Sequence, residues 1–216
     1  MDPEKIYYKL LKHFGKQNWW PAKTRFEVII GAILTQQTTW KNVEKAICNL
    51  KKLKLITPVR IAKADIAALE KAVYSTGFYK QKASRLKKFS EYLIENYNGN
   101  LDKFFSRNTK SIRTELLKLD GIGFETADSI LLYAGGKEIF VIDAYTKRMC
   151  KCHGISNDNY ENLRCFFEDN LERDVEIYKE YHAMIVELGK NYCKGKKPLC
   201  GECPLELDMV FEHPTN

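Results

Sequence analysis

The stretch that decides the fold is Leu116-Leu-Lys-Leu-Asp-Gly-Ile-Gly-Phe-Glu-Thr-Ala-Asp-Ser-Ile-Leu-Leu132. It predicts two helices joined by Gly121-Ile122-Gly123, because glycine adopts backbone angles that other residues avoid and lets the chain approach a ligand closely. Ile122 can bury between the helices. Amides at the start of the second helix point outward at its positive dipole end, which is the geometry of a phosphate site. Taken alone, Gly-x-Gly favours an ordinary helical hairpin with a glycine turn.

Apolar residues recur at helical spacing on both sides of this hairpin. Asp2-Pro3 is an N-cap with a first-turn proline, and Gly15 ends the first helix. Thr24 and Glu27 form a capping box before a very apolar helix. We predict helices over residues 3–14, 26–34, 40–53, 66–74, 80–97, 111–119, 124–133, 145–152, 161–171 (capped by Asp158) and 175–192.

The sequence offers no β-hairpin signal, since Asn98-Gly99 follows a helical pattern and Asp120-Gly121 lies between two of them. The one strand-like segment, Ile139-Phe-Val-Ile142, is too short to build a sheet and is better interpreted as a buried extended connector. We find no internal repeat and no low-complexity linker. The predicted fold class is therefore all-α.

Composition is that of a globular protein with a real core: 216 residues, 44% hydrophobic, with 12 Gly and 6 Pro. The longest apolar stretch, Val28 to Leu34, is far shorter than the ~20 residues that span a bilayer. The N-terminus carries two acidic residues and no apolar core of a secretion signal. We expect a soluble, cytoplasmic protein that does not contact membranes.

The net charge of +7 suggests a polyanionic partner. Basic residues cluster between Lys80 and Lys88 and between Lys194 and Lys197. A solvated helix face and a solvated loop explain such clusters about as often as a binding surface does.

Twenty residues beyond Gly123 stands Asp143, in Phe140-Val-Ile-Asp-Ala-Tyr-Thr-Lys-Arg148. Hairpin and aspartate together resemble the helix-hairpin-helix (HhH-GPD) DNA glycosylase superfamily, whose essential aspartate follows the hairpin in a similar context. The resemblance extends from Trp19 to Cys203. Its endonuclease III branch is nearest, through Leu34-Thr-Gln-Gln-Thr-Thr39, Gly77-Phe-Tyr-Lys-Gln-Lys-Ala83 and Cys193-x6-Cys200-x2-Cys203.

This resemblance implies two helical domains with a DNA-binding cleft between them. Residues 24–136 would form a six-helix, barrel-like domain that contains the hairpin, and residues 1–23 plus 137–216 a second helical domain that ends in the cysteine loop. The implied partner is double-stranded DNA with a damaged base, bound by a monomer.

Asp143 suits the cleavage of an N-glycosidic bond. Departure of the base leaves a sugar with oxocarbenium character, which a nearby carboxylate can stabilise while it helps to orient water. The resemblance assigns Asp143 this catalytic role. An aspartate before Ala-Tyr-Thr-Lys-Arg is also typical of a helix N-cap, and one residue can do both.

Bifunctional members of this branch carry a lysine two residues beyond the second hairpin glycine, where its amine forms a Schiff base with the sugar. This chain has Glu125 there. A carboxylate cannot form an imine, so we expect no strand cleavage by that route. Lys118, Lys137 and Lys147 lie nearby in sequence, but no motif places them at the sugar. As an acidic residue in the first turn of a helix, Glu125 also interacts favourably with the helix dipole.

Three tryptophans suggest a base pocket: Trp19 and Trp20, which precede Pro21, and Trp40, which follows Gln37 by three residues. Taken singly, each is more often a core residue. Together they can stack on an everted base, and a cationic alkylated purine gains additional attraction from an indole face. These residues resemble the bacterial 3-methyladenine DNA glycosylases of the endonuclease III branch.

That resemblance assigns three further side chains. Gln37 would fill the gap left by the flipped nucleotide, and Phe78 would wedge into the opposite strand. Lys190 matches a lysine near the base pocket. The alternatives are a core position for Phe78 and an ordinary exposed lysine for Lys190.

Seven cysteines, an odd number, suggest reduced thiols and a possible metal site. Cys193-x6-Cys200-x2-Cys203 matches the first three ligands of the endonuclease III iron-sulfur loop, so the resemblance favours a [4Fe-4S] cluster as cofactor. The family's fourth cysteine is replaced by Met209. Asp208 could supply an oxygen ligand, the loop could be a relic without a cluster, or zinc could bind the three cysteines with Asp208 or His213.

The sequence thus predicts a monofunctional glycosylase of base excision repair that removes alkylated purines such as 3-methyladenine. One rival has the same scaffold with a preference for oxidised pyrimidines or mismatched thymine. A rival of another class is a non-catalytic hairpin module that binds DNA phosphates, against which Asp143 argues.

Overall fold

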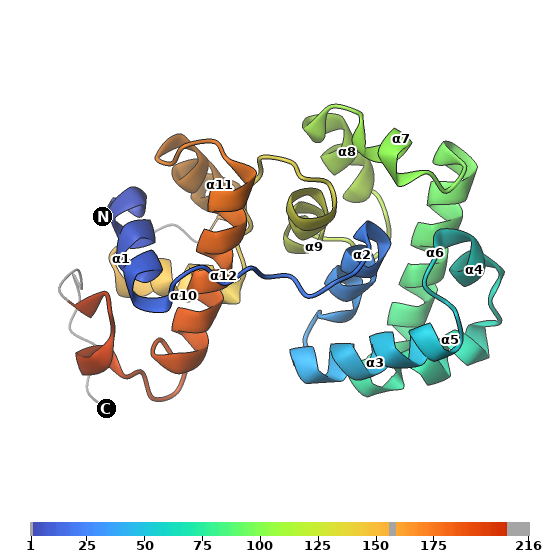
Figure 1. The fold of residues 1–216 in the computed structure, drawn as a ribbon, viewed down its shortest axis with the longest axis horizontal. Helices are drawn as coiled ribbons and strands as arrows, with labels where there is room; N and C mark the ends of the chain where they lie inside the picture. Colours follow the sequence, from blue (N-terminus) through green and yellow to red (C-terminus); the bar gives the residue numbers. More distant parts are fainter. Residues whose placement is uncertain (1, 156–158, 207–216) are drawn as a thin grey trace. The chain divides into compact units, whose positions relative to one another are not determined.

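The computed structural model describes residues 2–155 and 159–206. Throughout these residues the regular secondary structure is helical and no strand is formed, so the all-α prediction is confirmed (Figure 1). The chain divides into two compact units: unit 1 comprises Met1–Trp19 and Lys137–Asn216, and unit 2 comprises Trp20–Gly136. No helix in the described part of the chain is both long and apolar enough to cross a bilayer.

Unit 2 is built around α2, whose residues from Phe26 to Leu34 are all buried. A helix that is apolar on every side must be surrounded by others, and α2 packs against α3, α6, α9 and η2. The elements of unit 2 are α2 (Arg25–Leu34), α3 (Trp40–Lys52), α4 (Pro58–Lys63), α5 (Ile66–Val73), η1 (Tyr74–Thr76), α6 (Tyr79–Tyr97), α7 (Leu101–Phe105), α8 (Thr109–Leu116), α9 (Phe124–Ser129) and the π-helical turn η2 (Ile130–Ala134).

The capping box at the start of α2 forms only in part. The Thr24 hydroxyl accepts a hydrogen bond from the Glu27 amide at 3.1 Å, as predicted. The Glu27 carboxylate, however, accepts from the amide of Lys23 at 3.3 Å rather than from that of Thr24. Its other oxygen pairs with the Lys51 ammonium at 2.5 Å. Glu27 is therefore a buried link between α2 and α3 as well as a cap.

The two hairpin helices, α8 and α9, are joined by a buried ion pair. Arg113 donates two hydrogen bonds to the carboxylate of Asp128, at 2.6 and 3.0 Å, and Asp128 is fully buried. Directly after α9 the helix widens, so that the Gly135 amide bonds to the Ile130 carbonyl five residues back. This π-turn belongs to the predicted helix 124–133.

Unit 1 is organised around α12, which packs against α1 and α10 (Figure 1). Its elements are α1 (Pro3–Phe14), α10 (Ala144–Cys152), α11 (Tyr160–Asp169), α12 (Val175–Asn191) and the 3-10 turn η3 (Cys200–Glu202). Residues 139–142 of unit 1 precede α10 without regular secondary structure, and all four are buried. Phe140 stacks on Phe167 with ring centroids 4.4 Å apart. This confirms the buried connector that leads to Asp143.

The helix prediction missed two short α-helices and shifted two others, since the helix predicted over 111–119 is α8, Thr109–Leu116. The helices α4 and α7 have six and five residues, too few for an apolar periodicity to show. The helix predicted over 161–171 begins at Tyr160, is capped by Asn159 and ends at Asp169. Asp158, the predicted cap, lies outside the described residues.

Candidate active site

The hairpin turn depends on one of its two glycines. Gly121 has φ +74°, and a Cβ placed there would lie 1.8 Å from Nε of Arg85. Gly123 has φ −90° with an extended backbone and caps α9, and a Cβ there would meet nothing within 4 Å. Between them, Ile122 is buried as predicted, with 5% of its surface exposed.

Two side chains that the sequence analysis did not identify hold this turn. The Gln36 amide donates to the carbonyl of Gly121 at 3.0 Å and to the Thr126 hydroxyl at 2.9 Å. Arg85 in turn donates to the Gln36 side-chain oxygen at 2.7 Å. Gln36 lies in the same Leu-Thr-Gln-Gln motif that drew attention to Gln37, but spacing alone does not distinguish the two glutamines.

Gln37 and Phe78 both stand at exposed turns with left-handed backbones, φ +52° and φ +45°. Phe78 exposes 59% of its surface, so it is not a core residue. The turn before it is anchored by Lys82, a buried lysine whose ammonium donates to the Thr76 carbonyl at 2.7 Å. Burial, with a smaller contribution from the charge of Arg85, lowers the pKa of Lys82 to about 8.

Glu125 is exposed in the first turn of α9. The hairpin position at which a Schiff-base lysine would stand therefore presents a carboxylate to solvent.

Unit 2 also contains an aromatic group made of Trp20, Trp40 and Tyr133. Trp20 meets Trp40 edge to face, with ring centroids 5.4 Å apart, and lies 4.9 Å from the ring of Tyr133. A Cβ on Gly31 would come within 3.1 Å of Trp20, so the indole packs directly on α2. The Trp40 N–H donates to Glu44 at 3.0 Å. Tyr133 was missed because it looks like one more apolar position of a helix.

Trp19 belongs to unit 1, although it adjoins Trp20 in sequence. Its ring lies 5.7 Å from the imidazole of His182 on α12. Lys190, on the same helix, is exposed and pairs with Glu187 at 2.8 Å. Of the four residues predicted for the base pocket, the structure brings Trp20 and Trp40 together in unit 2 and places Trp19 and Lys190 in unit 1.

Asp143 is buried at the start of α10 and caps that helix. One of its oxygens accepts from the Thr146 amide at 2.7 Å and from the Thr146 hydroxyl at 2.9 Å. Its other oxygen faces Nε2 of His182 at 3.6 Å, an ion-pair distance when the imidazole is protonated. Burial by itself would raise the pKa of Asp143, but the contacts with His182 and Thr146 outweigh it and hold the pKa below its ordinary value. The buried side chain therefore stays a carboxylate at neutral pH.

His182 is a further candidate that the sequence analysis missed. It is buried, with 4% of its surface exposed, and it lies on α12, 39 residues after Asp143 in the sequence. A histidine on the apolar face of a helix carries no local signal that reveals such a partner.

The cysteine loop brings together thiols from two elements. The Sγ atoms of Cys193 and Cys152, the last residue of α10, are 3.7 Å apart. The contact with Cys152, aided by Arg148 and opposed by burial, lowers the pKa of Cys193 to about 6, while the same contact raises that of Cys152. Burial and the charge of Cys193 raise the pKa values of Cys200 and Cys203.

Within residues 2–155 and 159–206 no three His, Cys, Asp or Glu side chains are grouped closely enough to hold a metal ion, so the predicted [4Fe-4S] cluster is not shown. Cys193 contacts Cys152, a thiol from outside the loop. Met209, Asp208 and His213 lie outside the described residues.

Residues 30–173 match the HhH-GPD superfamily of base excision DNA repair proteins. The chain belongs to this superfamily. It is 51% identical to a provisionally assigned DNA repair glycosylase of Methanocaldococcus jannaschii, MJ1434, over 94% of this chain and 93% of that protein. It is 29% identical to endonuclease III of Thermotoga maritima, over 96% and 92% of the two chains.

Two solved structures of the superfamily share its fold. One is the 3-methyladenine DNA glycosylase MagIII of H. pylori bound to 1,N6-ethenoadenine, with a TM-score of 0.81, 32% identity and coverage of 88% of this chain and 98% of that chain. The other is a non-covalent endonuclease III-DNA complex, with a TM-score of 0.81, 25% identity and coverage of 97% and 96%. The predicted superfamily and branch are confirmed.

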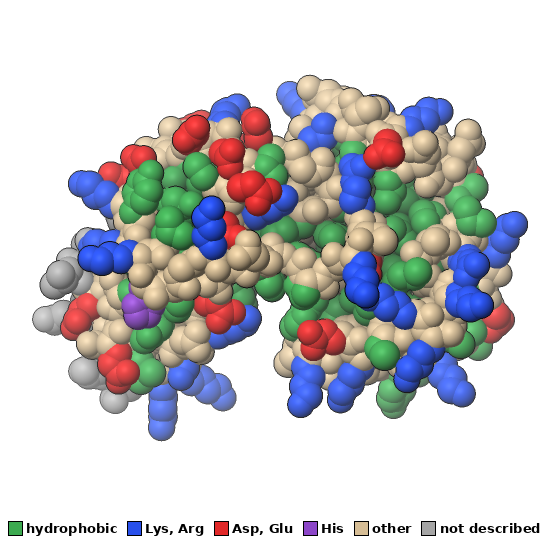
Figure 2. All heavy atoms as spheres, in the orientation of Figure 1, with side chains coloured by type: hydrophobic (Ala, Val, Ile, Leu, Met, Phe, Trp, Pro, Cys, Tyr) green, Lys and Arg blue, Asp and Glu red, His purple; other side chains and the backbone are tan. Residues whose placement is uncertain are grey.

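The superfamily's hairpin lies in the unit that carries the positive charge. Unit 2 has 20 Lys and Arg against 11 Asp and Glu, a net charge of +9, whereas unit 1 has 15 against 17, a net charge of −2. Figure 2 shows the basic side chains of unit 2 spread over its visible face rather than gathered in one patch. The positive field that attracts a polyanion therefore comes from unit 2 as a whole.

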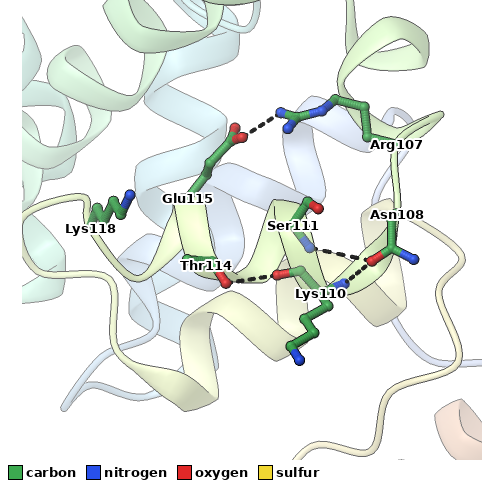
Figure 3. Close-up of a pocket in the computed structure, with 7 residues that line it drawn as sticks. All are labelled: Arg107, Asn108, Lys110, Ser111, Thr114, Glu115 and Lys118. Carbon is green, nitrogen blue, oxygen red and sulfur yellow. Dashed lines mark hydrogen bonds and ion pairs between the residues drawn. The ribbon is translucent and has the colours of Figure 1, made fainter.

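A hollow in unit 2 runs along α8 (Figure 3). Its lining is polar and charged, and two of its side chains, Arg107 and Glu115, pair with each other at 2.5 Å. Such a lining offers no ring on which a base could stack. The residues that line it are Arg107, Asn108, Lys110, Ser111, Thr114, Glu115 and Lys118.

The hairpin turn requires glycine at position 121 but not at position 123. Two alanine substitutions test this difference. Gly121→Ala forces a side chain into a left-handed backbone, at a cost of about 1–2 kcal/mol, and displaces Arg85 from Gln36. We expect a clear loss of unfolding free energy in urea. Gly123→Ala is the matched control and should change it by less than about 0.5 kcal/mol. Equal losses would show that the turn does not depend on Gly121 in this way.

Proposed function

We propose that this DNA glycosylase is monofunctional and hydrolyses the N-glycosidic bond of alkylated purines of the 3-methyladenine type. Membership of the superfamily supports DNA glycosylase chemistry. The observation that carries the proposal is Asp143, a buried carboxylate that its partners keep ionised.

The ionised carboxylate of Asp143 is matched to a sugar that becomes cationic. As the bond to the base breaks, the anomeric carbon gains positive charge, and a nearby carboxylate that is poorly hydrated stabilises this charge strongly. One oxygen is engaged by Thr146 and the other faces His182. Thr146 and His182 therefore act as positioning residues that orient the carboxylate.

The monofunctional character rests on Glu125. Without an amine at this hairpin position, the enzyme-sugar Schiff base of bifunctional relatives cannot form, and water is the nucleophile. The product is then an abasic site in an uncut strand.

Two observations support a cationic purine as substrate. The aromatic group of Trp20, Trp40 and Tyr133 offers electron-rich rings, whose attraction for a positively charged base adds to ordinary stacking. An alkylated, cationic purine is also a good leaving group and needs little acid catalysis. The 32% identity with MagIII, described as a 3-methyladenine glycosylase, supports the same class. Trp19 and Lys190 belong to unit 1, and their assignment to base recognition stays a prediction.

DNA engagement is proposed for the hairpin and for the two exposed turns of unit 2. The turn Gly121-Ile122-Gly123, in the unit with a net charge of +9, would contact phosphates through its glycine amides, since the Ile122 amide already donates to the Leu119 carbonyl at 3.0 Å. Gln37 would occupy the gap in the duplex, and the exposed ring of Phe78 would wedge between bases. Lys82 anchors the turn that carries Phe78.

The alternative on the same scaffold is a different base preference. The chain is 27% identical to a thymine/uracil-DNA glycosylase of Pyrobaculum aerophilum over 91% of its length. A panel of duplexes that carry 3-methyladenine, an oxidised pyrimidine or a mismatched thymine or uracil distinguishes these substrates. We expect release of the methylated purine to be fastest.

Asp143→Asn tests the catalytic assignment. The amide keeps the size of the side chain but has no charge with which to stabilise the sugar cation, so base release from methylated duplex should fall by about 10³-fold or more. Duplex affinity, measured by fluorescence anisotropy, should be nearly unchanged. Turnover close to that of the wild type would refute the catalytic role of Asp143, and with it the proposed mechanism.

Borohydride trapping tests the monofunctional assignment. A Schiff base between enzyme and sugar is reduced to a stable adduct, whereas hydrolysis by water leaves none. We expect little covalent protein-DNA product on denaturing gels, and strands that break only after alkali. Glu125→Lys serves as the comparison, since it restores an amine at the hairpin. Efficient trapping by the wild type would contradict the proposal.

Trp40→Ala tests the base pocket. Loss of a cation-π contact should slow release of a cationic methylated purine by about 2- to 30-fold, while affinity for undamaged duplex stays within error. Trp40→Phe is the matched control, because it keeps an aromatic face. Equal effects on release and on undamaged-duplex affinity would identify Trp40 as a packing residue.

His182→Ala tests the positioning role through pH. The contact with His182 lowers the pKa of Asp143 and counteracts the effect of burial, which raises it. Without the imidazole, the pKa of Asp143 should therefore rise. The carboxylate then becomes protonated at higher pH, and the acid limb of the base-release profile should shift toward neutral pH. His153→Ala is the control, since His153 is equally buried but lies at the other end of α10. An unshifted acid limb in His182→Ala would refute the positioning role.

A further inference from the structure

The side chain of Gln36 is hydrogen-bonded at both ends of its amide. The nitrogen donates to the Gly121 carbonyl at 3.0 Å and to the Thr126 hydroxyl at 2.9 Å. The oxygen accepts from Arg85 at 2.7 Å. A guanidinium only donates and a carbonyl only accepts, so these partners fix which end of the amide faces which. Gln36 therefore ties the turn that follows α2 to the hairpin and to α6.

Arg85 also fills the space beside the hairpin turn. A Cβ on Gly121 would lie 1.8 Å from Nε and 2.4 Å from Cζ of Arg85, so the guanidinium lies directly against the glycine. Arg85 stands on α6 about two helical turns beyond Phe78, the exposed residue that caps this helix. The helix that begins at the proposed wedge thus also carries the side chain that supports Gln36.

The residue after Gln36 has a backbone conformation that its side chain disfavours. Gln37 is exposed and has φ +52°, in the left-handed region. Such a conformation persists only where the surrounding structure imposes it. Before Gln37, the side chain of Gln36 is held by its hydrogen bonds to three residues. After it, the Thr38 amide donates to the Thr35 carbonyl at 3.3 Å and closes the turn.

We propose that Gln36, supported by Arg85, is a positioning residue for Gln37. It holds Gln37 at a fixed place relative to the hairpin, so that phosphate binding by the hairpin and insertion of Gln37 into the duplex occur together. This rests on the proposed function, in which Gln37 fills the gap left by the flipped nucleotide. All of the contacts that carry the proposal lie within unit 2.

The cost of opening the duplex is the physical reason for such a link. Extruding a nucleotide breaks its stacking and its base pair. A side chain that fills the gap offsets this cost best when its position is fixed before binding, because no ordering is then needed on the DNA. A Gln37 turn that moved independently of the hairpin would have to be ordered each time the protein binds.

Binding to a stable abasic analogue tests the link without base release. The probe is a duplex with a tetrahydrofuran site opposite 2-aminopurine, whose fluorescence rises when its stacking is disturbed. The measured quantity is the preference, the Kd for undamaged duplex divided by the Kd for the probe. We expect Gln36→Ala to lower this preference by about 3- to 10-fold, the effect of one or two lost hydrogen bonds, and to reduce the fluorescence rise at saturation.

Asn49→Ala is the matched control for a purely structural effect. The Asn49 amide donates to the Ala72 carbonyl at 3.2 Å, so this variant also removes an amide-to-carbonyl hydrogen bond of unit 2, here between α3 and α5. Its preference for the probe should stay within about 2-fold of the wild type. A loss equal to that of Gln36→Ala would overturn the proposal.

A double-mutant cycle shows whether Gln36 acts through Gln37. Gln37→Ala should lower the preference, and adding Gln36→Ala should lower it by no more than about 2-fold further. Additive losses, or a wild-type preference in Gln36→Ala, would overturn the proposal and leave the proposed function intact. A wild-type preference in Gln37→Ala would instead refute the gap-filling role, and the link with it.

Gln36→Glu repeats the test if Gln36→Ala fails to fold. The carboxylate keeps the size of the side chain and the contact with Arg85, but it has no donor for the Gly121 carbonyl. We expect the same loss of preference for the probe as in Gln36→Ala. A preference equal to that of the wild type would show that the bond to the hairpin does not position Gln37.

Discussion

A carboxylate that must stay charged inside a packed helical unit is the constraint on which the rest of this structure depends. Burial opposes the charge of Asp143, so unit 1 must supply compensating contacts at close range. It does so with the first turn of α10, through Thr146, and with His182 on α12. The packing of α10 against α12 fixes the distance between carboxylate and imidazole, and the catalytic role proposed for Asp143 depends on that distance.

Unit 2 differs from unit 1 in carrying the positive charge. This charge attracts a polyanion whatever its base sequence. Its net charge of +9 is spread over its surface, whereas the hairpin turn is held in one conformation by Gln36 and Arg85. In the proposed function the positive field raises the local concentration of DNA, and the rigid turn sets the position of the DNA. The ion pair of Arg113 and Asp128 keeps the two hairpin helices in register.

The departures from endonuclease III are consistent with one another. Glu125 stands where bifunctional members carry the Schiff-base lysine, and the aromatic group of unit 2 is the feature on which we base the proposed preference for alkylated bases. The cysteine loop departs as well, since Met209 stands where the fourth thiolate is expected while a thiol from α10 contacts Cys193.

The sequence by itself determined the features that depend on neighbours along the chain. They are the helical periodicity, the glycine turn, the buried connector 139–142, and the caps that Asp2 and Asp143 provide for α1 and α10. Each follows from residues a few positions apart. The short helices α4 and α7 were not predicted, because a helix of fewer than two turns shows no apolar periodicity. Only the tertiary structure decided the partners that lie far apart in sequence: His182 for Asp143, Gln36 for Gly121, and Cys152 for Cys193. It also assigned the adjacent residues Trp19 and Trp20 to different units. The physical reason is that a contact between distant segments depends on how whole helices pack, and no spacing within one segment records that packing.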